Sequence, residues 1–175
     1  MKESDTFPKS IKIGFTGTQV GMTGEQKLRF MDIFEKFKYP VIEFHHGDCI
    51  GADWEAHTLV CLYYPEITIH IHPPNVVTKR AFAHLKHIPK NLLVHKPADY
   101  LGRNHIIVNS TDILIATPKD FSMVMRSGTW ATIRYAGKNR KPVIRINPDG
   151  SISDGAFLGK ISKSRYNKII ELEEL

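Results

Sequence analysis

Short apolar runs alternate along the chain with segments of helical periodicity, and this alternation most limits the possible folds. Residues 11–15 (IKIGF), 41–45 (VIEFH) and 112–116 (DILIA) have the length and apolar content of buried strands. Helical patterns follow them. Strands that alternate with helices favour a parallel sheet covered by helices on both faces. The predicted fold class is therefore α/β, a mostly parallel sheet with helices on both faces.

The remaining elements follow from the same periodicities. Further strands are predicted at residues 67–72, 92–95 and 142–146. Helices are predicted at residues 24–38, 52–64, 77–87, 99–110, 128–137 and 164–173, with a loop at 147–155. On the first helix the apolar face would consist of Leu28, Met31, Phe34 and Phe37. We expect a tail at residues 1–10, one domain at 11–150, and a loop and helix at 151–175 packing on that domain.

Several classes of protein are excluded by length and composition. A chain of 175 residues corresponds to one domain. The longest apolar run, residues 59–64, is far below the roughly 20 residues of a membrane span, so no membrane partner is expected. The polar N-terminus lacks the apolar region of a signal peptide. The two cysteines, Cys49 and Cys61, lie in or beside an apolar segment, which favours a reduced, cytoplasmic protein.

Positive charge is concentrated in the last third of the chain. The whole sequence has 24 Lys and Arg against 18 Asp and Glu, a net charge of +6. Residues 126–168 alone contain ten Lys and Arg against two acids. Such a window indicates a phosphate-bearing partner, small or polymeric, or else a solvated basic face that keeps the protein in solution.

Candidate ligand-binding residues lie in four segments of this pattern. In a parallel sheet, ligands bind at the carboxyl ends of strands, where the chain turns into a helix. The four segments share glycines, hydroxyl or amide side chains and single charges. The candidates are Gly14, Thr16, Gly17, Thr18 and Gln19; Gly47, Asp48, Gly51 and Asp53; Arg103 and Asn104; and Arg126, Ser127, Gly128 and Thr129.

The chemistry of these residues suits an anionic ligand. Glycine lets backbone N–H groups approach a ligand closely. Ser127 opens a predicted helix, and free N–H groups at a helix start attract phosphate. Arg103 can clamp a phosphate or carboxylate with two hydrogen bonds, and Asp48 or Asp53 can address sugar hydroxyls. Each segment also has a plain structural interpretation, as a tight turn, a helix cap or a surface charge, but together they favour a site.

Four sequence blocks resemble a known superfamily. They are IKIGFTGTQ, HHGDCIGADWEAH, GRNHIIVNSTDILIA and SGTWATIRYAGKNRKPVIRI, which span residues 11–146. Together they resemble the SLOG superfamily, which includes the Smf/DprA proteins and the LOG phosphoribohydrolases. The resemblance implies a single Rossmann-like domain. It also implies a nucleotide, a nucleotide derivative or a nucleic-acid strand lying over these turns, and a homodimer.

The resemblance also orders the possible functions. The LOG enzymes carry a catalytic Glu where this chain has Thr132, and their Pro-Gly-Gly is missing before Ser127. The leading prediction is therefore a sensor or binding protein for a nucleotide-derived ligand. One alternative is a LOG-like hydrolase or transferase acting on the N-glycosidic bond of nucleotides, with Asp53 and Arg103 as catalytic residues. Another alternative is DprA-like binding of single-stranded nucleic acid.

No metal and no other cofactor is expected from the sequence. His45 and His46 point to opposite faces of a strand, and His70 and His72 share one strand face. Neither Cys-x-x-Cys nor His-Glu-x-x-His occurs. His57 is expected to support the neighbouring turn. Trp54 and Trp130 follow candidate turns, where they would stack on a base or pack against the sheet.

Overall fold

The computed structural model describes residues 9–153, which form a seven-stranded sheet with the order β4-β3-β2-β1-β5-β6-β7. All neighbouring strands are parallel except β6 and β7. The predicted α/β class, a mostly parallel sheet with helices on both faces, is confirmed. Of the expected segments, residues 1–8 of the tail at 1–10 and the whole helix at 164–173 lie outside the described residues.

The strands and helices alternate through most of the chain. The strands are β1 (Ile11–Gly17), β2 (Val41–His46), β3 (Thr68–Ile71), β4 (Leu92–Val94), β5 (Ile113–Thr117), β6 (Val143–Ile146) and β7 (Ile152–Ser153). The helices are α1 (Gly24–Glu35), α2 (Ala52–Tyr63), α3 (Ala83–Lys86), α4 (Tyr100–Asn109) and α5 (Gly128–Lys138), with a short 3-10 turn at Val77–Lys79. No helix among these is long and apolar enough to span a membrane.

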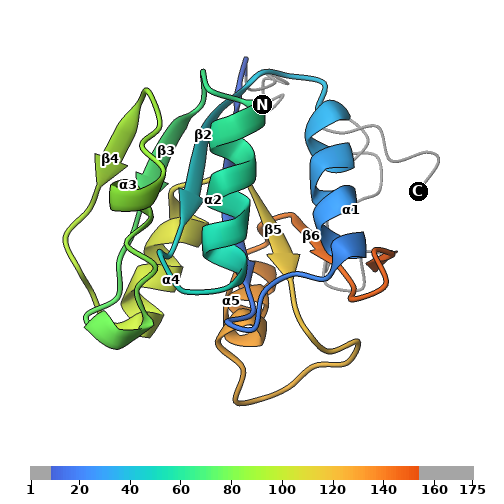
Figure 1. The fold of residues 1–175 in the computed structure, drawn as a ribbon. Coiled ribbons are helices and arrows are strands. Elements are labelled where there is room, and N and C mark those ends of the chain that lie inside the picture. The colour runs from blue at the N-terminus through green and yellow to red at the C-terminus, as the bar shows by residue number, and fades with distance from the viewer. Residues whose placement is uncertain (1–8, 154–175) are drawn as a thin grey trace, which may run out of the picture.

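Two apolar cores lie on the two faces of the sheet. Helices α1 and α2 cover the face toward the viewer in Figure 1, and α4 and α5 lie behind the sheet. The front core centres on Phe15, Phe30 and Phe44, whose rings contact one another at centroid distances of 5.5 to 6.1 Å. The rear core is smaller and is built around the fully buried Trp130 of α5. A core on each face makes both surfaces of the central strands apolar, as their sequences require.

The first helix buries its predicted apolar face except at Leu28, since Phe34 is buried and Met31 and Phe37 pack against the core. Gln26, Phe30, Ile33 and Phe34 are its buried residues, whereas Leu28 is 75% exposed. The prediction for Leu28 was wrong because Gln26 occupies the buried position. The Gln26 amide nitrogen donates to the carbonyls of Pro118 and Ile146, so a polar side chain is satisfied inside. The expected capping box of Thr23 and Gln26 is present.

Other boundaries also differ from the predictions. The helix expected at 77–87 is interrupted, because Phe82 has left-handed backbone angles just before α3. Tyr63, expected on the inner side of α2, is 63% exposed in the last turn of that helix. The loop expected at 147–155 contains β7, because Asn147–Gly150 makes a tight turn that folds the chain back onto β6.

The order of the strands creates a switch point between β1 and β5. The chain winds from β1 outward to β4, and α4 then returns it to β5 on the other side of β1. Helices that leave β1 and β5 diverge to opposite faces, which opens a crevice at the carboxyl ends of these two strands. Gly17, at the end of β1, lies in close contact with Ala52 of α2 and Thr117 of β5, where a Cβ atom has no room.

Candidate functional site

A cleft of about 410 Å³ lies at this switch point. The carboxyl end of β5 is at the lower edge of the sheet in Figure 1. The end of β1, the turn after β2, the start of α4 and the segment between β5 and α5 form its walls. This volume falls within the range of small-molecule sites. The cleft therefore occupies the position where open parallel sheets bind their ligands.

The structure brings most of the predicted site residues together around this cleft. Those that line it are Thr16, Gly17, Thr18, Gln19, Gly47, Asp53, Arg103, Asn104, Arg126, Ser127, Gly128 and Thr129. They come from all four predicted segments, which are separated by up to about a hundred residues in sequence. The convergence follows from the parallel topology, since the carboxyl ends of all these strands meet at one edge.

Three predicted residues stand outside the cleft and have packing roles instead. A Cβ at Gly14 would lie 2.7 Å from Thr111 Oγ1 and 3.1 Å from a methyl group of Ile107, so Gly14 lets α4 pack closely on β1. Gly51 has a φ of +85° and contacts the carbonyl of Gln19. Both glycines shape the walls of the cleft without facing a ligand.

The Asp48 carboxylate is directed away from the cleft. One oxygen accepts from Arg80 Nε at 2.9 Å and the other from the amide of Ala83 at 3.0 Å. The side chain is fully buried, and the pair of bonds holds the segment before α3 against the turn. We therefore leave Asp48 out of the ligand-binding set and keep Asp53 as the carboxylate that could reach sugar hydroxyls.

Arg103 is a buried cation in the wall of the cleft. Its side chain is 4% exposed, and Nη1 donates to the carbonyl of Gly47 and contacts Cys49 Sγ at 3.3 Å. The Asp99 carboxylate, four residues earlier, does not pair with Arg103, because it caps α4 by accepting from Gly102 N. Among the described residues, no acceptor lies within hydrogen-bond distance of Arg103 Nε. A buried guanidinium with a spare donor is suited to an anionic ligand.

Asp53 shares this buried environment. It is 5% exposed, and its Oδ2 accepts from the amide of Cys49 at 3.1 Å. Burial raises the pKa of Asp53 to about 6, although the nearby Arg103 opposes the shift. Such a raised pKa means that ionised Asp53 lowers the stability of the folded protein. Ionisable groups with shifted pKa values are common in functional sites.

The start of α5 forms the opposite wall. Ser127 is the N-cap, and its hydroxyl accepts from Trp130 N at 3.3 Å. Gly128 and Thr129 are the first helical residues and line the cleft, and the amide groups of a first helical turn have no partner within the helix. A Cβ at Gly128 would meet no atom within 4 Å, which shows that open space lies in front of this residue.

Two hydrogen-bonded histidines, His46 and His57, support the turn after β2. His57 Nε2 donates to the carbonyl of His87 at 2.8 Å, and this leaves its Nδ1 to accept from His46 Nε2 at 2.9 Å. His46 Nδ1 in turn accepts from the amide of Asp48 at 3.1 Å. Burial lowers the pKa of both histidines, so both are neutral. His57 supports the turn, as the sequence suggested.

Several residues of the cleft were not predicted. They are Phe15, Val20, Cys49, Tyr100, Ile107, Lys119, Asp120 and Val124. Tyr100 is the first residue of α4. Its hydroxyl accepts from Gln19 Nε2 at 3.2 Å, and the Arg103 guanidinium lies 4.8 Å from its ring centroid. Neither Trp54 nor Trp130 lines the cleft, since Trp130 is fully buried in the rear core and Trp54 stacks near His57. The sequence signal that could have identified Tyr100 is its position directly after Asp99, the N-cap of the helix that carries Arg103.

The basic window reaches the cleft at one described position. Arg126 lines the cleft, whereas Arg134 donates to the carbonyl of Met125, and Lys141 donates to the carbonyl of Thr111. The part of the window beyond residue 153 lies outside the described residues. The cleft gains its positive charge from Arg103 and Lys119 as well as from Arg126.

Comparison with known proteins agrees with this architecture. The fold is similar to that of DNA processing protein A (DprA) from Streptococcus pneumoniae, with a TM-score of 0.59 and 17% sequence identity. The fold is DprA-like. The match covers 87% of this chain and 54% of the other, so the chain spans about half the length of that DprA structure. No protein-family model matches the chain, and no curated protein sequence matches it.

We predict that Asp53→Asn stabilises the protein at neutral pH. Since the folded state holds the Asp53 proton more tightly than the unfolded chain, the favourable contribution is complete below about pH 4 and is lost as the pH rises through about 6. The neutral amide avoids this loss and still accepts from the Cys49 amide. The free energy of unfolding, measured by urea denaturation, should exceed that of the wild type by about 1–3 kcal/mol at pH 7.5.

The same measurement at pH 4 is the control, because there the wild-type Asp53 is itself mostly protonated. The gain should shrink to nearly zero. A variant that is less stable than the wild type at pH 7.5, or a gain of equal size at both pH values, would contradict the buried charge assigned to Asp53.

Proposed function

We propose that the cleft binds the phosphate of a nucleotide-derived ligand, and that the protein acts as a sensor or binding protein for it. The observation that carries the proposal is the convergence on one cleft of the start of α5 and the buried Arg103. Free N–H groups at a helix start and a guanidinium are two independent devices for holding phosphate. The cleft between Arg103 and the start of α5 is also lined by Gly17 and Thr18, at the end of β1.

The charges around the cleft support an anionic ligand. Three cationic side chains, Arg103, Lys119 and Arg126, line it against two carboxylates, Asp53 and Asp120. The cationic side chains therefore outnumber the carboxylates around the cleft. Asp53 also lines the cleft, and in this proposal its carboxylate accepts from the hydroxyls of a sugar. A ligand that carries both a phosphate and a sugar is a nucleotide or one of its derivatives.

Binding is favoured over cleavage of the N-glycosidic bond. Such cleavage depends on a carboxylate that offsets positive charge on the sugar. Thr132 stands at the position of the LOG glutamate, is buried, and donates its hydroxyl to the carbonyl of Gly128 at 2.9 Å. The catalytic alternative therefore depends on Asp53 with Arg103. Asp53 and Arg103 can bind a nucleotide without cleaving it, and we propose that they bind it.

The first prediction concerns Gly128. In Gly128→Val the side chain would occupy the open space in front of the helix start and displace a bound phosphate. The fold should be retained, because no protein atom lies within 4 Å of the added Cβ. Calorimetric titration with the four common nucleoside 5′-monophosphates should show that the tightest of them loses at least about tenfold in affinity.

Gly24→Val is a matched control. Gly24 is likewise the first helical residue after a side-chain cap, and nothing lies within 4 Å of its Cβ position, but it is outside the cleft. It should bind as the wild type does. Unchanged affinity in Gly128→Val, an equal loss in both variants, or a wild type that binds none of the monophosphates would contradict the proposal.

The second prediction concerns Arg103. A charge-assisted hydrogen bond contributes roughly 1.5–3 kcal/mol, so Arg103→Ala should weaken binding of the same monophosphate by about ten- to a hundredfold. Arg103→Lys keeps the charge but loses the planar fork, and should recover part of the affinity. Thermal midpoints are measured beside the affinities, because Arg103 also holds Gly47. A large fall in midpoint with normal affinity would restrict Arg103 to a structural role.

Single-stranded nucleic acid is a second candidate ligand, favoured by the segment between β5 and α5. This segment extends below the sheet in Figure 1 and carries Phe121, Met123 and Met125, which are 49–69% exposed. Lys119 and Arg126 flank them and line the cleft. Exposed apolar side chains beside cations suit stacked bases along a phosphate backbone. The structurally similar protein is a DNA processing protein by name.

The dependence of binding on salt separates these two candidates. A small ligand releases few counterions, whereas a strand releases about 0.7 per phosphate that the protein contacts. We expect a shallow slope of log affinity against log salt, with a 5′-monophosphate binding at least as tightly as a dT12 oligonucleotide in fluorescence competition. A slope steeper than about −2 with preferred binding of dT12 would favour the nucleic-acid candidate.

A further inference from the structure

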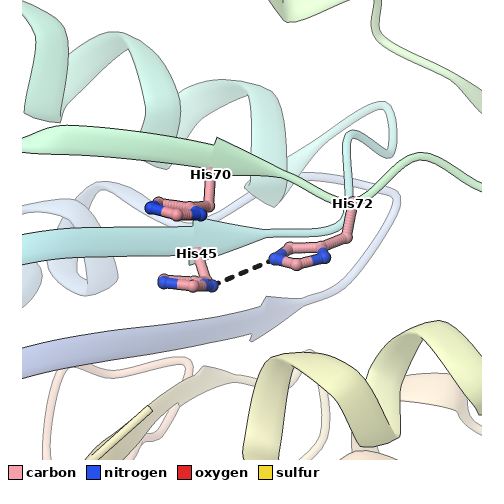
Figure 2. A group of neighbouring side chains, drawn as sticks. All are labelled: His45, His70 and His72. Carbon is pink, nitrogen blue, oxygen red and sulfur yellow. Dashed lines mark hydrogen bonds between the residues drawn. The ribbon is translucent and has the colours of Figure 1, made fainter. Parts of the chain in front are cut away.

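Four histidines gather on the rear face of strands β2, β3 and β4. The register causes this, because His45 pairs with His70 and Val94 pairs with Ile71, which places His95 opposite His72. Phe44, Ile69 and Ile71 belong to the front core, so the alternating residues point to the other face. Figure 2 shows His45, His70 and His72 side by side at the ends of these strands. None of the four histidines lines the cleft.

The four rings form two stacked pairs. His45 stacks on His70 and His72 stacks on His95, each with ring centroids 4.1 Å apart and planes within 7° of parallel. Across the pairs, His45 Nδ1 lies 3.0 Å from His72 Nε2, as the dashed line in Figure 2 marks, and His70 Nδ1 lies 3.0 Å from His95 Nε2. Each ring therefore directs one nitrogen at one partner ring. Ligand atoms of His45, His70 and His72 all lie within 4.8 Å of one another.

A carboxylate orients this group from outside. Glu43 accepts from His45 Nε2 at 2.9 Å, which places the proton on Nε2 and leaves the Nδ1 lone pair facing His72. Lys12 Nζ lies 3.3 Å from Glu43 and holds that carboxylate in position. Metal-bound histidines usually donate their second nitrogen to a carboxylate in this way, which fixes the tautomer and the ring orientation.

The group is also in a protonation state that can bind a cation. Burial lowers the pKa of His45 to about 4 and that of His72 to about 3, so both rings are neutral at physiological pH. Neutral imidazole is the form that coordinates metals. His95 is exposed at the rim, which gives an ion a path from solvent.

We propose that His45, His70 and His72 bind one divalent transition-metal ion, and that His95, whose Nε2 lies 3.0 Å from His70 Nδ1, moves in as the fourth ligand. A ligand set made of imidazole nitrogens suits zinc, nickel or copper rather than magnesium or calcium, which prefer oxygen. For tetrahedral zinc, with Zn–N bonds of about 2.0–2.1 Å, the 3.0 Å nitrogen pairs open to about 3.3 Å and the stacked rings tilt toward the ion. The bound ion fastens the short strand β4, of three residues, to β3 and β2.

The experiment uses the untagged full chain after removal of metals with a chelator. Titration with Co²⁺ should produce visible absorption bands that saturate at one ion per chain, and Zn²⁺ should displace them. His72→Gln and His95→Gln should each weaken Co²⁺ binding by at least about tenfold. His105→Gln is the matched control, since His105 stacks on Tyr135 away from the group, and it should bind as the wild type does.

Thermal unfolding gives a second readout that does not depend on the cobalt bands. Zn²⁺ in excess should raise the midpoint of the wild type and of His105→Gln, because a ligand that binds only the folded state stabilises it. It should raise that of His95→Gln by clearly less, and the exposed position of His95 makes this the variant least disturbing to the fold. Absence of saturable binding at one ion per chain would overturn the proposal. So would binding that survives in both His72→Gln and His95→Gln.

Discussion

The hydrogen bond from Arg103 to the carbonyl of Gly47 joins helix α4 to the turn after β2. Helix α4 is the element that returns the chain to the centre of the sheet. The contact is so close that a Cβ at Gly47 would lie 2.6 Å from Arg103 Nη1. Glycine at this position is therefore a requirement of the buried guanidinium. The cleft exists in its observed form because both sides of the switch point meet at this bond.

Burying a cation has consequences for its surroundings. Arg103 lies close enough to Asp53 to oppose the effect of burial on the pKa of that carboxyl, and close enough to lower the pKa of His46 and His72 further. Uncompensated buried charge costs stability, and proteins accept this cost where the charge has a use. The proposed use is a phosphate that lies between the Arg103 guanidinium and the amide groups at the start of α5. Only the bound state would then have its charges fully satisfied.

Much of this arrangement could be predicted from the sequence, because it depends on local signals. Strand and helix periodicity placed the elements, and the rule that ligands meet the carboxyl ends of strands grouped Gly17, Asp53, Arg103 and Gly128 in advance. The hydrogen-bond partners of individual side chains were harder to predict. Asp48 lies in the same predicted turn as Asp53, yet its carboxylate accepts from Arg80 and Ala83. That contact depends on how the segment before α3 folds back.

Features that depend on strand register could not be predicted from the sequence. His45 and His70 form a group only because β2 and β3 pair in one register, and His95 joins through β4, whose pairing no local pattern specifies. Leu28 shows the related limit for helices, since the choice of buried face was decided by Gln26 and its two carbonyl partners. Homodimer formation and a cytoplasmic location remain predictions.

The central claim is that one phosphate lies between α5 and Arg103. Chemical-shift mapping on the ¹⁵N-labelled protein during titration with a nucleoside 5′-monophosphate tests it most directly. The account predicts the largest shifts at the amides of Gly128, Thr129 and Thr18 and at the Arg103 Nε–H, which lacks an acceptor among the described residues. Shifts confined to surface lysines and arginines, with these four signals unmoved, would contradict it.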